Sequence, residues 1–346
     1  MKALEKEFAE RVVNWFCREG RVLPWREGRN PYRIWVSEVM LQQTRIEAVI
    51  PYYHRFLAEL PHISSLANCS EDKLLKLWEG LGYYSRARNL KKAAQLVEME
   101  FGGELPSKAA TLRELPGIGE YTAGAIASIA YGEPEPAVDG NVLRVVCRVL
   151  GDRGDVLSPA TKKRITALLR DIYPTGKAAG DLTEGIMEIG ERVCIPNGIP
   201  LCTVCPLKEL CVAKKENLTA EIPVRSPKKE RKKIPMTVFV LRCGDKYAIR
   251  KRDSKGLLAG MWEFFHTENT LSNQEAKSFL EEQGFQVKNL RSCGSNRHIF
   301  THLEWQMKGY AVTVTEEKEN FLWLSREEME RDFALPTAFQ PFKPQK

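Results

Sequence analysis

The chain of 346 residues is long enough for two domains with separate hydrophobic cores. It has no apolar run of about eighteen residues and no basic leader before an apolar segment, so we expect a cytoplasmic protein, associated with the nucleoid if bacterial, with no membrane partner. The net charge is +7, but five of the seven excess charges lie within residues 214–235, so it supports nucleic-acid binding only weakly.

Helical periodicity dominates the first 213 residues. Apolar side chains recur at helical spacing in residues 46–60 and 74–81, and strand-like alternation is scarce before residue 235. The 28 basic and 27 acidic side chains of this part nearly cancel. We therefore predict an α-helical first domain over residues 1–213.

A charged residue stands in an apolar stretch near the start of this domain. Glu38 lies among Ile34, Val36, Val39 and Leu41. Apolar surroundings disfavour the ionised carboxylate and raise its pKa, which suits a general acid. A glutamate exposed in a first helical turn, where it complements the helix dipole, is the alternative.

A Leu-Pro-Gly-Ile-Gly-Glu-Tyr run predicts a helix-hairpin-helix. A short helix ends at Pro116, Gly117 and Gly119 allow a turn with positive φ, and a second helix begins at Glu120. Such a turn directs unpaired backbone N–H groups at one point, which suits a DNA phosphate. Asp139 would bring a carboxylate close to it. An ordinary interhelical turn and a plain Asx-turn are the alternatives for these two runs.

Four cysteines fall in the short segment 194–211, with the spacing C-x7-C-x2-C-x5-C. The chain has nine cysteines and no signal peptide, which indicates a reducing compartment where clustered cysteines bind metal more often than they pair. Zinc is the usual occupant of four cysteines, but zinc folds usually show two separated C-x2-C knuckles. We interpret the loop as a structural metal centre that gives the region around Lys208 a fixed shape for phosphate contact.

The composition changes after this loop. Residues 214–235 contain three prolines and carry 8 basic against 3 acidic side chains, which predicts a linker. We interpret it as a solvated spacer, and a dedicated DNA contact is the alternative. Strand-like segments follow at residues 236–241, 246–250, 306–315 and 321–324, with a helical one at 270–283. We predict an α+β module over residues 236–346.

Four runs of the first domain together resemble the adenine DNA glycosylases of the MutY type, in the helix-hairpin-helix superfamily that includes endonuclease III. They are Ser-Glu-Val-Met-Leu-Gln-Gln-Thr (37–44), Trp-Glu-Gly-Leu-Gly-Tyr-Tyr-Ser-Arg (78–86), Val-Asp-Gly-Asn-Val (138–142) and the cysteine loop. The resemblance implies a [4Fe–4S] cluster on Cys194, Cys202, Cys205 and Cys211, although the family usually has six residues, not seven, before the second cysteine.

The same resemblance implies roles for single residues. Glu38 would protonate adenine, at N7, and Asp139 would stabilise the oxocarbenium-like sugar by charge or by transient covalent attack. Tyr121 would hold the Asp139 side of the site by hydrogen bonding. Strand-cleaving members carry a lysine nucleophile at the position of Tyr121. The residues expected to line the flipped-adenine pocket are Arg21, Trp25, Arg26, Leu41, Ile46 and Glu188.

DNA contacts are expected from Gln43, Thr44, Tyr83, Gly117 and Gly119. Gln43 and Tyr83 would wedge into the duplex where adenine leaves, because an inserted aromatic ring offsets part of the lost stacking. Core packing is the alternative for Tyr83.

The C-terminal module resembles the MutT-like (Nudix) domain of the same enzymes, most clearly in Gly-Leu-Leu-Ala-Gly-Met-Trp-Glu-Phe (256–264). A working Nudix hydrolase needs R-E-x-x-E-E-x-G, and Lys-Ser-Phe-Leu-Glu-Glu-Gln-Gly (277–284) lacks the first glutamate, a magnesium ligand. We therefore interpret the module as a sensor. His298, Thr301 and His302 resemble the family loop that contacts 8-oxoguanine, with ordinary hairpin residues as the alternative.

These observations predict a monomeric, monofunctional adenine DNA glycosylase. It would hydrolyse the N-glycosidic bond of adenine paired with 8-oxoguanine or guanine in double-stranded DNA and leave an abasic site. A glycosylase-lyase like endonuclease III is disfavoured by Tyr121 and by the second domain. An inactive DNA-binding protein is disfavoured by Glu38 and Asp139, and nucleotide hydrolysis by the altered Nudix helix.

Overall fold

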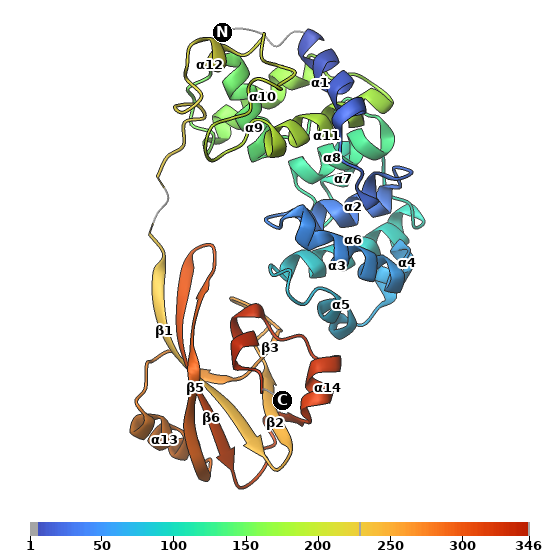
Figure 1. Cartoon of the computed structure of the whole chain (residues 1–346). Helices are drawn as coiled ribbons and strands as arrows, with labels where there is room; N and C mark the ends of the chain where they lie inside the picture. Colours follow the sequence, from blue (N-terminus) through green and yellow to red (C-terminus); the bar gives the residue numbers. More distant parts are fainter. Residues whose placement is uncertain (1–5, 228–229, 345–346) are drawn as a thin grey trace. The chain divides into compact units, whose positions relative to one another are not determined.

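The computed structural model describes residues 6–227 and 230–344, which divide into two compact units (Figure 1). The described residues of the first unit are 6–68 and 89–227, and those of the second are 69–88 and 230–344. Residues 1–5, 228–229 and 345–346 lie outside the described residues. They are the outer ends of the two predicted domains and two lysines of the predicted linker. The second unit thus combines a short helical segment with the C-terminal module.

The first unit is built from helices. They are α1 (Lys6–Glu19), the 3-10 turn η1 (Pro24–Arg26), α2 (Pro31–Leu41), α3 (Ile46–Glu59), α4 (Ile63–Asn68), most of α6 (Ser85–Phe101), α7 (Ala109–Leu112), α8 (Glu120–Tyr131), α9 (Gly140–Leu150), α10 (Pro159–Arg170), α11 (Lys177–Arg192) and α12 (Val212–Lys215). Within the described residues, no strand precedes Lys232, as the periodicity predicts. No helix in the same residues has both the length and the apolar character needed to cross a membrane.

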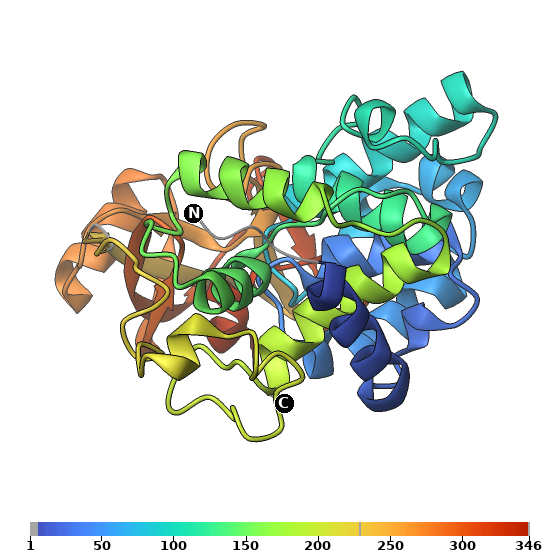
Figure 2. The ribbon, with the colours of Figure 1, turned by 90° about the horizontal axis from the view of Figure 1, so that it is seen from above.

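Helix α11 is central to this unit because it contacts α1, α8 and α9. Helix α1 is drawn in dark blue in Figure 2, and its close contact with α11 depends on a glycine of α11. A Cβ atom at Gly185 would lie 2.7 Å from Val12 Cγ1, so a larger residue would push the two helices apart. This packing fixes the position of the α11 residues Glu184 and Glu188, both of which are buried.

The second unit is a mixed sheet with helices. Its elements are α5 (Glu71–Leu77), β1 (Lys232–Cys243), β2 (Lys246–Lys251), β3 (Trp262–Glu263), β4 (Phe265–Thr267), α13 (Asn273–Glu282), β5 (Val287–Ile299), β6 (Leu303–Val314), β7 (Leu322–Leu324), α14 (Arg326–Asp332) and η2 (Thr337–Phe342). The main strand order is β3-β2-β1-β6-β5, with β4 paired to β1 and β7 to β2. Strands β1 and β6 are parallel, and the other pairs are antiparallel.

Both faces of this sheet are covered, as the alternation along β1 makes clear. Met236 and Val238 belong to one apolar cluster, whereas Phe239 and Leu241 belong to another. Successive side chains of a strand point to opposite faces, so the two clusters lie on opposite sides of the sheet. The α+β character predicted for residues 236–346 is confirmed.

Three local features differ from the sequence-based expectations. Helix α7 ends at Leu112 rather than at Pro116, because the chain turns before the proline. Strand β5 was not among the predicted strands, because most of its side chains are exposed and no alternation marks it, and only its ladder with β6 defines it. Residues within the predicted spacer pack on the first unit: Ile222 is buried, and the backbone N–H of Val156 donates to the Val224 carbonyl at 3.0 Å.

Candidate active site

The turn between α7 and α8 has one glycine in the left-handed region rather than two. Gly117 has φ +79°, and a Cβ there would lie 2.7 Å from the Asn89 Cβ. Gly119 is extended (φ −88°, ψ −178°) and is the N-cap residue of α8, so the prediction of a positive φ was wrong for it. A Cβ at Gly119 would meet nothing within 4 Å. The space beside Gly119 is therefore open at the N-terminus of α8, where the first amides of a helix attract an anion.

Glu38 lies well beyond the first turn of α2 and is only 6% exposed, which rules out the alternative of a solvent-exposed first-turn glutamate. The hydroxyl of Tyr121, from α8, donates a hydrogen bond to Glu38 Oε2 at 2.7 Å. Burial raises the pKa of Glu38 to about 7, and the hydrogen bond from Tyr121 opposes the rise. The sequence-based expectation of a raised pKa is confirmed, and the carboxyl group can hold a proton near neutral pH.

Asp139 is the N-cap residue of α9. Its Oδ1 accepts from the Val142 backbone N–H at 2.8 Å, and its Oδ2 accepts from Asn141 Nδ2 at 2.9 Å. Burial raises the pKa of Asp139, and these hydrogen bonds oppose the rise. The Asx-type geometry foreseen as the structural alternative is thus present, and it also fixes the orientation of the carboxylate.

The predicted hydrogen bond between Tyr121 and the Asp139 side is not formed. The Tyr121 hydroxyl bonds to Glu38 Oε2 and approaches Met187 Sδ at 3.6 Å. The reason lies in helix packing, because α2 and α8 contact each other directly. Tyr121 therefore acts on the protonation of Glu38, while Asp139 depends on its own helix terminus.

Several residues predicted for the adenine pocket form a network of ion pairs around α11. Arg21 Nε contacts Glu188 Oε1 at 2.5 Å, and Arg26 Nη2 contacts Glu188 Oε2 at 3.0 Å. Arg26 Nε also contacts Glu184 Oε1 at 2.7 Å. Glu188 is 1% exposed, and its pKa is lowered despite its burial because both arginines stabilise its charge.

Glu184 was missed by the sequence analysis. It is buried, it pairs with Arg26, and its negative charge adds to the rise in the pKa of Glu38. Its spacing of four residues from Glu188 on one helix was the available signal. Of the other predicted pocket residues, Trp25 is buried with its ring edge-to-face against Tyr53. Leu41 and Ile46 are half-buried.

Gln43 and Tyr83, the two predicted wedge residues, share an unusual backbone conformation. Their φ angles are +59° and +47°, in the left-handed region that side chains rarely adopt. Such strain tends to occur where a side chain is held in place for function. Tyr83 is 44% exposed, so core packing does not account for it. The Thr44 hydroxyl donates to the neighbouring Gln42 carbonyl at 3.4 Å.

A cavity of about 420 Å³ in the second unit brings together Tyr83 and the predicted 8-oxoguanine loop. His298, Thr301 and His302 all line it. The Tyr83 and Thr301 hydroxyl oxygens lie 3.0 Å apart, within hydrogen-bonding distance. The loop closes the β5–β6 hairpin, as the structural alternative foresaw, and its exposed residues Thr301 and His302 leave polar groups available to a ligand.

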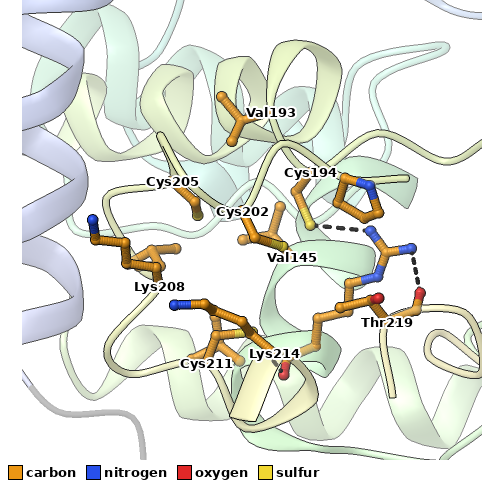
Figure 3. Close-up of a pocket in the computed structure, with 13 residues that line it drawn as sticks. Val145, Val193, Cys194, Cys202, Cys205, Lys208, Cys211, Lys214 and Thr219 are labelled. Carbon is orange, nitrogen blue, oxygen red and sulfur yellow. Dashed lines mark hydrogen bonds between the residues drawn. The ribbon is translucent and has the colours of Figure 1, made fainter. Parts of the chain in front are cut away.

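The four clustered cysteines line one pocket, together with apolar residues that include Val145 and Val193 (Figure 3). The buried Arg148 donates from Nη1 to Cys194 Sγ at 3.3 Å, and from Nε and Nη2 to the carbonyls of Ile222 and Thr219. In the conformation described, no group of three or more His, Cys, Asp or Glu side chains of the described residues could hold a metal ion. Four cysteines in an apolar setting with an arginine at one sulfur nevertheless fit the donor set of an iron–sulfur cluster.

Comparisons with known proteins identify the family of the chain. Residues 36–174 match the family model of the HhH-GPD superfamily of base excision DNA repair proteins, and residues 237–344 match that of the NUDIX domain. The human adenine DNA glycosylase is 34% identical, over 93% of this chain and 70% of its own length. The chain belongs to the adenine DNA glycosylase family.

Further relatives extend this family assignment. The adenine DNA glycosylase of Buchnera aphidicola subsp. Acyrthosiphon pisum is 33% identical, over 85% of this chain and 83% of its own length. Among solved structures, a thermostable thymine-DNA glycosylase superimposes with a TM-score of 0.55 and 27% identity, covering 61% of this chain and 97% of its own. The helical fold is therefore shared with a glycosylase that is named for a different base.

Proposed function

We propose that the protein removes adenine mispaired with 8-oxoguanine or guanine from double-stranded DNA and leaves an abasic site. The observation that carries the proposal is the buried Glu38 carboxyl group, which accepts a hydrogen bond from Tyr121 and has a pKa of about 7. A group with that pKa can be protonated in a neutral solution and can still give its proton away. Membership of the adenine DNA glycosylase family supports the choice of base.

The two carboxyl groups divide the reaction between them. Glu38 gives its proton to N7 of a flipped adenine, so the bond between C1′ and N9 breaks with its electron pair leaving on the base. Asp139, whose oxygens are held by Val142 and Asn141, faces the positive charge that develops on the sugar. A water molecule then adds to C1′ and loses its proton to a carboxylate. Tyr121 supplies no amine, so the strand stays intact.

The second unit supports the choice of the opposite base. Tyr83 and Thr301 place hydroxyl groups 3.0 Å apart at one cavity, which His298 also lines. These donors and acceptors suit the altered edge of 8-oxoguanine. We therefore propose that this unit recognises 8-oxoguanine. The predicted monomeric state, cytoplasmic location and domain boundaries stay predictions.

The cysteine pocket supports a structural cofactor. Cys194, Cys202, Cys205 and Cys211 would hold a [4Fe–4S] cluster that ties the end of α11 to α12. When bound, the cluster cross-links the loop and leaves the reaction to the carboxylates. Iron and sulfide analysis of the purified protein tests this proposal: four irons per chain, lost in Cys202→Ala, are expected, and stoichiometric zinc would contradict it.

A single-turnover assay tests the activity. Labelled duplexes carrying adenine opposite 8-oxoguanine, guanine or thymine are incubated with excess protein and analysed with and without alkali. We expect alkali-dependent cleavage opposite 8-oxoguanine and guanine but not opposite thymine. Cleavage without alkali would indicate a lyase, and tight binding to the mispair without cleavage would indicate an inactive sensor.

A further inference from the structure

A groove of about 560 Å³ in the first unit is lined mostly by residues to which neither the carboxylate pair nor the helix-hairpin-helix assigns a role. Four segments form it: α7 with the residue that follows it, the start of α8, the loop before α9, and α10. Tyr121 also lines the groove, as does Val138, which directly precedes Asp139. The groove is therefore continuous with the residues that hold the two carboxylates.

Helix α10 turns one complete face toward this groove. Its lining residues recur at helical spacing, namely Pro159, Lys162, Lys163, Thr166, Ala167 and Arg170. The opposite face, with Ile165 and Leu169, is buried in the core. At a rise of about 1.5 Å per residue the stripe is about 16 Å long. The phosphates of one DNA strand follow each other at about 3.4 Å along the duplex axis, so the stripe can reach more than one of them.

The charges in the groove favour a polyanion. Arg113, Lys162, Lys163 and Arg170 are its cations, and Glu120 and Glu135 are its two acidic residues. Arg170 is paired with Glu135 at 3.1 Å. No ion pair of Lys162 or Lys163 occurs among the described contacts, and Lys163 is exposed. The groove therefore keeps a positive balance after its internal pair is formed.

We propose that this groove holds phosphates of the DNA backbone, with Lys162 and Lys163 as the cations that neutralise them. The inference rests on the proposed function, because it needs DNA to lie against the α8 terminus. Arg113 follows α7 directly and lies in the same turn as Gly117, so a strand bound at that turn continues into the groove. These contacts position the duplex without reading its sequence, because phosphates carry no base identity.

The experiment measures binding of the full-length protein to a fully paired duplex across a range of salt concentrations. The variant Lys162→Gln/Lys163→Gln removes both charges and keeps good helix formers. Each lost phosphate contact should reduce the slope of log affinity against log salt by about 0.9, so the double variant should lose about 1.8. The ratio of mispair to paired-duplex affinity should stay as in the wild type.

Lys177→Gln is the matched control. Lys177 is exposed at the start of α11, and the preceding Gly176 donates to Gly132, the C-cap residue of α8. It thus lies at the end of α8 remote from the DNA-binding turn, and its loss should leave the slope unchanged. Lys163→Gln alone, at an exposed position, should lose about 0.9 and covers the case in which the double variant does not fold.

Two results would overturn the proposal: an unchanged slope in the double variant, or an equal fall in Lys177→Gln, which would show a general charge effect. Adenine release by the wild type is measured separately on the mispaired duplex. Its absence would overturn the proposed function, whereas the slopes decide the role of the groove.

Discussion

Replacing Tyr121 with phenylalanine removes one hydrogen bond from the buried Glu38 carboxylate and keeps the aromatic ring. In the wild type, burial raises the pKa of Glu38 to about 7, and the Tyr121 hydroxyl opposes the rise because it stabilises the ionised form. A hydrogen bond to a charged group contributes about 1.5–3 kcal/mol. One pKa unit corresponds to about 1.4 kcal/mol, so the pKa of Glu38 should rise by about one to two units in Tyr121→Phe.

Single-turnover adenine release measured between pH 5 and pH 10 tests this expectation. A general acid must be protonated, so the wild-type rate should fall as the pH rises through about 7, the pKa of Glu38. In Tyr121→Phe the same fall should occur about one to two pH units higher. The control is Tyr173→Phe, another half-buried tyrosine of the first unit, whose hydroxyl meets Thr183 rather than a carboxylate. A fall at the wild-type pH or below it in Tyr121→Phe would refute the reasoning.

Three further predictions concern activity and stability. Glu38→Gln should slow adenine release by about 10²–10⁴-fold. It should also raise the free energy of unfolding above pH 7 by at most about 3 kcal/mol. The raised pKa of Glu38 means that the folded protein binds more protons than the unfolded chain between about pH 4.5 and 7, so the wild type loses stability as the pH rises through that window. Urea titrations should therefore show the gain at pH 8 and not at pH 4.5, and an equal gain at both would contradict the prediction. Gly117→Ala should lower the free energy of unfolding by about 1–3 kcal/mol, since the new side chain combines a positive φ with a contact of 2.7 Å to Asn89. Gly119→Ala should lower it by less than about 1 kcal/mol in the same titration, and equal losses would disprove the distinction. Glu79→Ala should destabilise the second unit by about 2 kcal/mol or more, because two lysines, a glutamine and a backbone N–H all donate to the Glu79 carboxylate. Hydrogen exchange in β1 and β6 measures this loss of stability, and unchanged exchange would show that the carboxylate is dispensable.

The features that the sequence could predict are those that depend on neighbours along the chain. The apolar residues on both sides of Glu38 indicated burial and a raised pKa, and both are confirmed. The start of α8 at Glu120 followed from the glycines before it. The change from helical to strand-like periodicity after residue 235 indicated the α+β module. The long runs that resemble adenine DNA glycosylases indicated the family, which the comparisons confirm.

Features that depend on packing between distant segments could not be predicted in this way. Tyr121 and Glu38 are 83 positions apart, and only the contact of α2 with α8 decides that the hydroxyl meets Glu38 and not the Asp139 side. Glu184 resembles any helical glutamate until α11 packs at the centre of its unit. Strand β5 has little apolar pattern of its own, because its partner β6 supplies the hydrogen bonds that define it. Local chemistry is therefore determined by the sequence, whereas the partners of each charged group are set by the tertiary structure, because burial and pairing depend on which surfaces meet.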